Sequence, residues 1–247
     1  MVIPIRDENP TRRSAVVTVA LIVVNLAVYF GIQYPKSDAA EARFDYRWAG
    51  VPCEVTRNHP LTIESYQSQQ CRAGPASPTN EIFPDKNVWL GVVFSMFLHG
   101  SILHVLGNML FLWIFGNNVE DQLGRVAFLV FYLIGGIAAS GAHIIGNANS
   151  IVPFLGASGA IAAVMGAYIV WFPRARVWSL VPILFFLGLL RLPAALVLGL
   201  WFVLQLFVQS DSGIATLAHI AGFVFGMVVA WVLARIARFP RGAPVFR

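Results

Sequence analysis

Residues 154–164 read FLGASGAIAAV, a stretch in which a single serine stands among glycines, alanines and aliphatic residues. A hydroxyl group in an apolar environment is costly unless it has a hydrogen-bond partner. Small residues at such a position also allow two helices to pack closely in a membrane. Ser158 is therefore either a packing residue between helices or a reactive group, and the surrounding sequence must distinguish the two.

The composition indicates an integral membrane protein. Of the 247 residues, 57% are hydrophobic and only 12% are charged, whereas about 25% are charged in a typical soluble domain. The net charge of +5 comes from basic residues scattered between apolar runs. Since they form no dense patch, the expected partner is a lipid bilayer and not a nucleic acid.

The apolar sequence divides into candidate membrane spans at its charges, prolines and glycines. Crossing a hydrocarbon layer of ~30 Å takes about 20 helical residues. The candidates are residues 14–34, 101–115, 126–146, 159–171, 194–209 and 216–234. They predict an all-α, six-transmembrane-helix bundle over residues 14–238, with tails at 1–13 and 239–247. Residues 177–190 are expected to form a loop in or near the membrane interface, because Arg191 and Pro193 interrupt the apolar run there.

The distribution of arginines predicts the orientation. Arginines cluster in the N-terminal tail, the fourth loop and the C-terminal tail, and the third and fifth loops have none. By the positive-inside rule, both termini are cytoplasmic in a multi-pass protein of the plasma (inner) membrane. Residues 14–34 could instead be a signal peptide, with Ala40-Glu41-Ala42 as its cleavage site. Because the run is longer than a signal core, we expect a retained anchor.

The long first loop, residues 36–88, is then an outward-facing segment within the membrane domain. It contains both cysteines of the chain, Cys53 and Cys71. If the loop faces an oxidising compartment, we expect a structural disulfide between them in preference to two free thiols.

Three polar side chains on the second, fourth and sixth spans are expected at one depth. Each lies 16 residues before a charged residue that we place at the cytoplasmic interface; the pairs are His104 and Glu120, Ser158 and Arg174, and His219 and Arg235. At ~1.5 Å per helical residue, all three side chains lie about 24 Å above that interface. They would therefore lie at one level, below the outward face.

Helix faces favour contact between the fourth and sixth spans. His219, Gly222 and Gly226 form one stripe, and Ser158, Ala162 and Gly166 form another. Small residues such as these glycines and Gly159 let two backbones approach closely. That approach predicts an imidazole within ~3 Å of the serine oxygen, as general-base catalysis requires.

His104 and Asn108 lie one turn apart and project from the same face of the second span. Both can donate hydrogen bonds, as can the free N–H groups at the start of the fourth helix. Such donors stabilise a developing oxyanion, each by ~3 kcal/mol in the transition state. We expect the two residues to form an oxyanion hole.

These residues lie in three motifs, which resemble those of the rhomboid family of intramembrane serine proteases. The motifs are His99-Gly-Ser-Ile-Leu-His104-Val-Leu-Gly-Asn108, Gly156-Ala-Ser158-Gly159 and Ala218-His219-Ile-Ala-Gly222-Phe-Val-Phe-Gly226. The resemblance implies a Ser158–His219 dyad that cleaves transmembrane segments of other proteins, with no cofactor and no metal. It also implies that His104, Asn108 and the Ser158 N–H form the oxyanion hole, and that His99 supports a loop.

The sequence departs from the family pattern at two places. Many members carry an aromatic residue one turn after the serine, against which the histidine packs, whereas this chain has Ala162. The Trp-Arg pair of some members is replaced by Arg47-Trp48, in reverse order and upstream. We also expect a substrate gate beside the fifth span, with Trp201 packing against the second span, and contacts between Glu120, Asp121 and Arg125.

Other classes of function fit the sequence less well. A zinc hydrolase would need a carboxylate near the histidines, and an α/β-hydrolase elbow would need glycine at Ala160. A transporter would show inverted repeats, and none is visible. The remaining alternative is a non-catalytic rhomboid-like protein that binds transmembrane helices. The sequence leaves the oligomeric state unknown.

Overall fold

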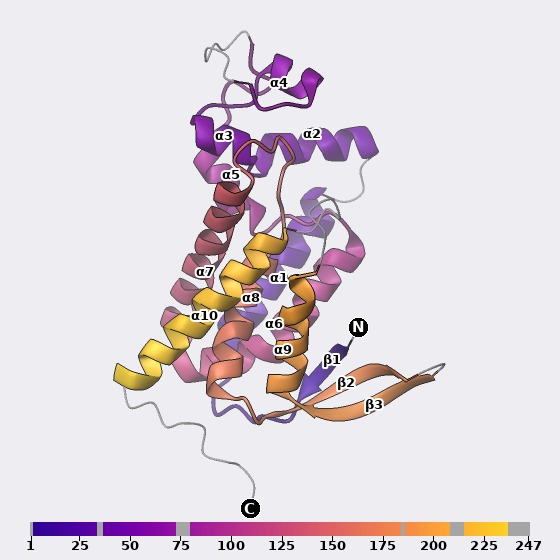
Figure 1. Ribbon diagram of the computed structural model, residues 1–247, viewed down its shortest axis with the longest axis vertical. Coiled ribbons are helices and arrows are strands. Elements are labelled where there is room, and N and C mark those ends of the chain that lie inside the picture. The colour runs from indigo at the N-terminus through magenta and orange to yellow at the C-terminus, as the bar shows by residue number, and fades with distance from the viewer. Residues whose placement is uncertain (1, 34–36, 73–79, 184–185, 208–214, 237–247) are drawn as a thin grey trace, which may run out of the picture.

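The computed structural model describes residues 2–33, 37–72, 80–183, 186–207 and 215–236, and most of them are helical. The long helices are α1 (Val16–Val28) with its π-helical extension η1 (Tyr29–Gln33), α6 (Ile102–Leu123), α7 (Arg125–Gly146), α8 (Ser158–Trp171), α9 (Ala194–Gln205) and α10 (Thr216–Ile236). The shorter helices between η1 and α6 are α2 (Asp38–Trp48), α3 (Pro52–Arg57) and α4 (Ile63–Ser68) in the first loop, and α5 (Val88–Ser95) after it. Figure 1 shows the long helices as a bundle, with α2–α5 gathered at one end.

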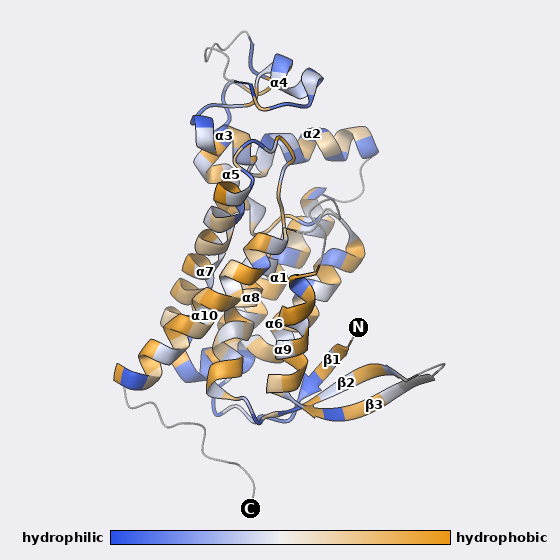
Figure 2. Cartoon of the chain, viewed as in Figure 1, coloured by the Kyte–Doolittle hydropathy of each residue, from blue (hydrophilic) through white to orange (hydrophobic). Residues whose placement is uncertain are grey.

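Each apolar segment predicted from the sequence overlaps one long helix. Among the described residues, four helices are long and apolar enough to cross a membrane: Val16–Gln33, Ile102–Leu123, Arg125–Gly146 and Thr216–Ile236. Helices α8 and α9 are apolar but shorter. In Figure 2, hydrophobic residues run along the long helices, and hydrophilic ones concentrate in the first loop and at the ends of the bundle. The predicted tail at 239–247 and the last residues of the first and fifth predicted spans lie outside the described residues.

Helix α6 continues past the predicted end of its span, and its acidic residues bind the start of α1. The Glu120 carboxylate accepts hydrogen bonds from the backbone N–H groups of Val17 and Thr18, at 3.0 and 2.7 Å, and from the Thr18 hydroxyl. Asp121 accepts from two backbone N–H groups just before the helix. A carboxylate is favourable there because a helix N-terminus carries free N–H groups and positive dipole charge. The expectation that these acids meet Arg125 was wrong.

A three-stranded antiparallel sheet lies at the end of the bundle opposite α2–α5 (Figure 1). Its strands, in the order β1-β2-β3, are β1 (Ile3–Asp7), β2 (Arg176–Ile183) and β3 (Phe186–Pro193). Residues 177–183 and 186–190 fall within the segment expected to form an interfacial loop, but they belong to the paired strands β2 and β3, in which Trp178 pairs with Arg191. The all-α prediction missed this sheet, because pairing between β1 and the distant β2 leaves no local periodicity in the sequence.

Strand β1 is held to the helices through Asp7. The Tyr168 hydroxyl on α8 and the Asn118 side-chain amide on α6 each donate a hydrogen bond of 2.7 Å to the same Asp7 carboxylate oxygen. Burial raises the pKa of Asp7 from 3.8 to about 6, although both hydrogen bonds act to lower it. The N-terminal strand is thus tied to the helix that begins with Ser158.

Helix α8 lies at the centre of the bundle, and every residue from Gly159 to Tyr168 is buried. Its closest neighbour is α10, which it meets backbone to backbone. A methyl group at Gly166 would overlap the carbonyl oxygen of Phe223 on α10, and one at Gly226 would overlap that of Ala163 on α8. Small residues therefore set the short distance between the two helices.

The first loop folds into a separate small cluster around a disulfide between Cys53 and Cys71. Beneath it, Lys86 and Glu54 form a buried ion pair of 2.5 Å, with each side chain 2% exposed. The Lys86 ammonium also donates to a backbone carbonyl, and Glu54 accepts from a backbone N–H, so both charges are satisfied by further hydrogen bonds.

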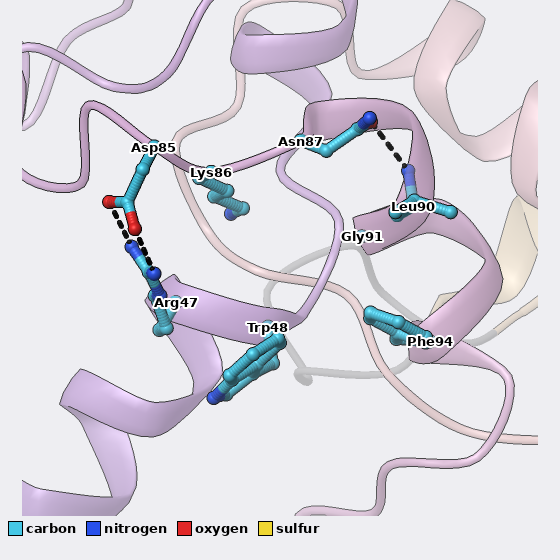
Figure 3. A pocket seen from close by; sticks show the side chains of 8 residues that line it. All are labelled: Arg47, Trp48, Asp85, Lys86, Asn87, Leu90, Gly91 and Phe94. Carbon is cyan, nitrogen blue, oxygen red and sulfur yellow. Dashed lines mark hydrogen bonds and ion pairs between the residues drawn. The ribbon is translucent and has the colours of Figure 1, made fainter.

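Arg47 lines a pocket between α2 and α5 (Figure 3). Its guanidinium donates two hydrogen bonds, of 2.6 and 2.5 Å, to the carboxylate of Asp85. The neighbouring Trp48 ring packs edge-on against Phe94, with centroids 6.0 Å apart. The Arg47-Trp48 pair therefore links α2 to α5 and to the segment before it, at the end of the bundle where α2–α5 gather.

Candidate active site

Ser158 is the first residue of α8, at the point where an irregular segment turns into the central helix. Gly156, two residues earlier, has φ +130°, a conformation that favours glycine. A Cβ at this position would lie 3.0 Å from Cε1 and Nε2 of His104 and 3.5 Å from the Ser158 hydroxyl oxygen. The backbone and the available space both require glycine there, and the His104 ring and the Ser158 hydroxyl border the same small space.

The side chain of His219 reaches Ser158 from α10. Its Nε2 lies 2.8 Å from the Ser158 hydroxyl oxygen, the distance of a hydrogen bond. Gly222, one turn after His219, makes this possible, because a methyl group there would overlap the carbonyl oxygen of Gly159. Both side chains are half-buried. An imidazole so placed can remove the hydroxyl proton and activate the oxygen as a nucleophile.

Helix α6 supplies the neighbouring hydrogen-bond donors. The Ser101 hydroxyl oxygen accepts from the backbone N–H of His104 and caps the helix, which positions His104 in its first turn. Asn108 lies one turn further on. Its buried side-chain nitrogen has no hydrogen-bond partner among the described residues. An amide in this state can donate to a substrate oxygen without first breaking another hydrogen bond.

Comparison with known proteins identifies the family to which this chain belongs. A family model described as the Rhomboid domain matches residues 86–236, more than half of the chain. The chain belongs to the rhomboid family.

Several curated proteins are similar to this rhomboid chain. Presenilin-associated rhomboid-like protein A, mitochondrial, of Danio rerio is 33% identical over 144 residues, which cover 58% of this chain and 32% of that protein. Rhomboid protease GlpG of Pectobacterium atrosepticum is 32% identical over 136 residues, 54% of this chain and 45% of that protein. The GlpG of Yersinia pestis is 30% identical over 138 residues, 55% and 45% of the two chains. The chain thus spans less than half the length of these relatives.

Two other histidines lie near the rhomboid site. His99 is fully buried and its ring packs edge-on against that of His104, with centroids 5.2 Å apart. Gln33, at the end of η1, holds the His99 backbone by two hydrogen bonds, one to its carbonyl and one from its N–H. His143 lies in the last turn of α7, 5.3 Å from the Phe154 ring. Within the described ranges, no group of three or more His, Cys, Asp or Glu residues is placed to hold a metal ion.

Helix α9 contributes two side chains that the sequence analysis did not place in the site. Gln205 Oε1 lies 2.8 Å from His219 Nδ1, and the Trp201 ring lies 5.8 Å from the imidazole, centroid to centroid. Trp201 also packs against Phe223, so the aromatic neighbours of its ring among the described residues are on α10. Since Ala162 offers no ring, Trp201 provides the aromatic surface for His219 from another helix. The only sequence feature that could have indicated a role for Gln205 is its position as a polar residue within an apolar span.

Proposed function

We propose that this rhomboid protein is an intramembrane serine endopeptidase that cleaves transmembrane segments of other membrane proteins. The observation that carries the proposal is the 2.8 Å separation between His219 Nε2 and the Ser158 hydroxyl oxygen. The rhomboid proteases among its relatives support the same reaction class. In this proposal Ser158 is the nucleophile and His219 is the general base.

The reaction follows from the chemistry of this pair. His219 takes the hydroxyl proton while the Ser158 oxygen attacks the substrate carbonyl, and a tetrahedral oxyanion forms. The imidazolium then returns the proton to the leaving amine, and the peptide bond breaks. Water, activated by the neutral imidazole, hydrolyses the acyl-enzyme and releases the second product.

We assign the stabilisation of the oxyanion to three donors, from His104, Asn108 and the backbone of Ser158. The His104 ring borders this space together with the serine oxygen, and Asn108 carries a side-chain N–H group free to donate. The backbone N–H of Ser158 belongs to the first turn of α8 and has no helical acceptor. Donors fixed before the reaction stabilise the developing charge without reorganisation.

The same proposal fixes the topology. Six helices cross the plasma (inner) membrane, with α8 and α9 as the short spans, and both termini are cytoplasmic. In support, β1 lies at the end of the bundle opposite the disulfide-bonded first loop (Figure 1). That loop then faces the outward compartment, where a disulfide is stable, and water reaches Ser158 from the same side.

The substrate must expose a carbonyl that a transmembrane helix hides in its own hydrogen bonds. Segments with Gly, Ser or Pro near the outward face unwind at lower cost than Leu-rich segments. We therefore expect cleavage at small or helix-breaking residues, after the segment enters beside α9.

The competing function is that of a non-catalytic rhomboid-like protein that binds transmembrane helices. Purified protein, reconstituted in liposomes with a tagged single-span substrate, separates the two. We expect cleavage by the wild type and by Ser140→Ala, a control serine on α7, and none by Ser158→Ala or His219→Ala. Equal cleavage by the wild type and Ser158→Ala would refute the nucleophile. Substrate retention without cleavage by the wild type would establish the binding function.

A further inference from the structure

Two residues of α9, Trp201 and Gln205, lie one turn apart, and both face His219. The carbonyl oxygen of Gln205 is 2.8 Å from Nδ1, the ring nitrogen that faces away from Ser158. The Trp201 ring lies against the imidazole at an interplanar angle of 39°. His219 is therefore contacted on both ring nitrogens, by Ser158 from one helix and by Gln205 from another.

The orientation of the Gln205 amide determines which tautomer of His219 is favoured. Its Nε2 lies 3.5 Å from the backbone carbonyl oxygen of Trp201, to which it donates. With the NH₂ group directed there, the carbonyl oxygen faces His219 and can only accept. Nδ1 must then carry the ring proton, so that Nε2 presents its lone pair to the Ser158 hydroxyl. The opposite tautomer would place an N–H on the serine oxygen and could not act as a base.

We propose that Gln205 is a positioning residue, which fixes His219 in the tautomer that accepts the Ser158 proton. The inference rests on the proposed proteolytic function and adds a third residue to it. When Nε2 takes the proton, the same carbonyl oxygen accepts a charge-assisted hydrogen bond from the imidazolium. Gln205 thereby favours both the neutral base and its protonated product, without contacting the substrate.

The group that accepts the hydrogen bond from His219 Nδ1 is uncharged. The titratable groups that interact electrostatically with His219 are His104 on α6 and His143 on α7. In the part of the chain that the structure describes, no carboxylate is hydrogen-bonded to Nδ1. An amide oxygen holds the tautomer while leaving the ring neutral at rest.

Two substitutions of Gln205 distinguish a role as hydrogen-bond acceptor for His219 from a role in packing alone. Gln205→Met keeps the length of the side chain but removes the acceptor, and Gln205→Glu keeps the acceptor but removes the amide donor. Leu204→Met, on the same turn and 41% exposed, is the matched control. Each protein is assayed in liposomes for kcat and KM across pH, and its apparent thermal midpoint is recorded.

We expect Gln205→Met to lower kcat by about 10- to 100-fold, the effect of losing a hydrogen bond to a charged group, with KM within about twofold. Gln205→Glu should restore most of kcat at its optimum. It should also move the acid limb of the pH profile to higher pH, because a carboxylate favours the protonated imidazole. Wild-type kcat in Gln205→Met, or a loss that glutamate does not restore, would overturn the proposal.

A measurement that does not need turnover separates this inference from the proposed function. In protein labelled with ¹⁵N-histidine, the His219 signals, assigned by their loss in His219→Ala, should show the Nδ1–H tautomer in the wild type and a mixture in Gln205→Met. If the wild type is no more active than Ser158→Ala, the proposed proteolytic function is wrong. The ¹⁵N signals of His219 would still show whether Gln205 sets its tautomer. An Nε2–H tautomer in the wild type would overturn the role of Gln205 alone.

Discussion

Gly222 of α10 packs so closely against the carbonyl oxygen of Gly159 on α8 that a methyl group at position 222 would overlap it. This contact lies next to both reacting groups, because Ser158 precedes Gly159 and His219 lies one turn before Gly222. The spacing of the two helices and the 2.8 Å distance between serine and imidazole therefore depend on the same glycine.

Gly222→Ala should force α8 and α10 apart and lower kcat/KM by about 100-fold or more, since a displacement of ~1 Å at the reacting atoms has that effect. The same overpacking should lower the free energy of unfolding by about 1–3 kcal/mol. Gly141→Ala on α7 is the control, because a methyl group there meets nothing within 4 Å. Wild-type cleavage by Gly222→Ala would contradict the dependence on close packing.

Asn108→Ala tests the oxyanion hole. Removing one donor should lower kcat by about 100-fold and leave KM within about twofold, because the hydrogen bond strengthens in the transition state. Steady-state kinetics on a reconstituted substrate measure both constants. A raised KM at unchanged kcat would instead assign Asn108 to substrate binding.

Asp7 should make stability depend on pH. Because its pKa is raised from 3.8 to about 6, the folded protein holds this proton more tightly than the unfolded chain. Its contribution is complete below about pH 4 and is lost as the pH rises to about 6, a change of at most about 3 kcal/mol. Asp7→Asn removes the titration, so its apparent thermal midpoint should fall less than that of the wild type between these pH values. Parallel curves for the two proteins would show that Asp7 does not titrate in this range.

The disulfide should stabilise the first loop. Cys53 and Cys71 are separated by 18 residues, and closing a loop of about that size contributes about 3 kcal/mol. Replacing both by serine should make residues between α2 and α5 sensitive to added protease, while the membrane helices stay protected. Equal protease resistance in the wild type and the double variant would show that the loop is held without the disulfide.

Local patterns in the sequence predicted much of this molecule. Apolar runs predicted where the long helices of the described residues lie, and the stripes of small residues around Ser158 and His219 predicted which helices meet. Helical spacing was sufficient there because both residues lie on regular helices, whose rise and period are fixed.

Contacts between distant segments could not be predicted in this way. Strand β1 pairs with β2 across more than half the chain, and Glu120 caps a helix that begins about a hundred residues earlier. Gln205 gave only a weak signal, a polar residue in an apolar span, because the sequence does not determine which face of α9 meets His219. Each of these contacts depends on tertiary packing that no local window contains.

The most direct test of the central claim is labelling by a fluorophosphonate, followed by peptide mass spectrometry. If Ser158 is a nucleophile activated by His219, the wild type should carry a single adduct on the peptide containing Ser158, and His219→Ala should label at least about 100-fold more slowly. An adduct on another residue, or equal labelling of Ser158 in the two proteins, would contradict the account.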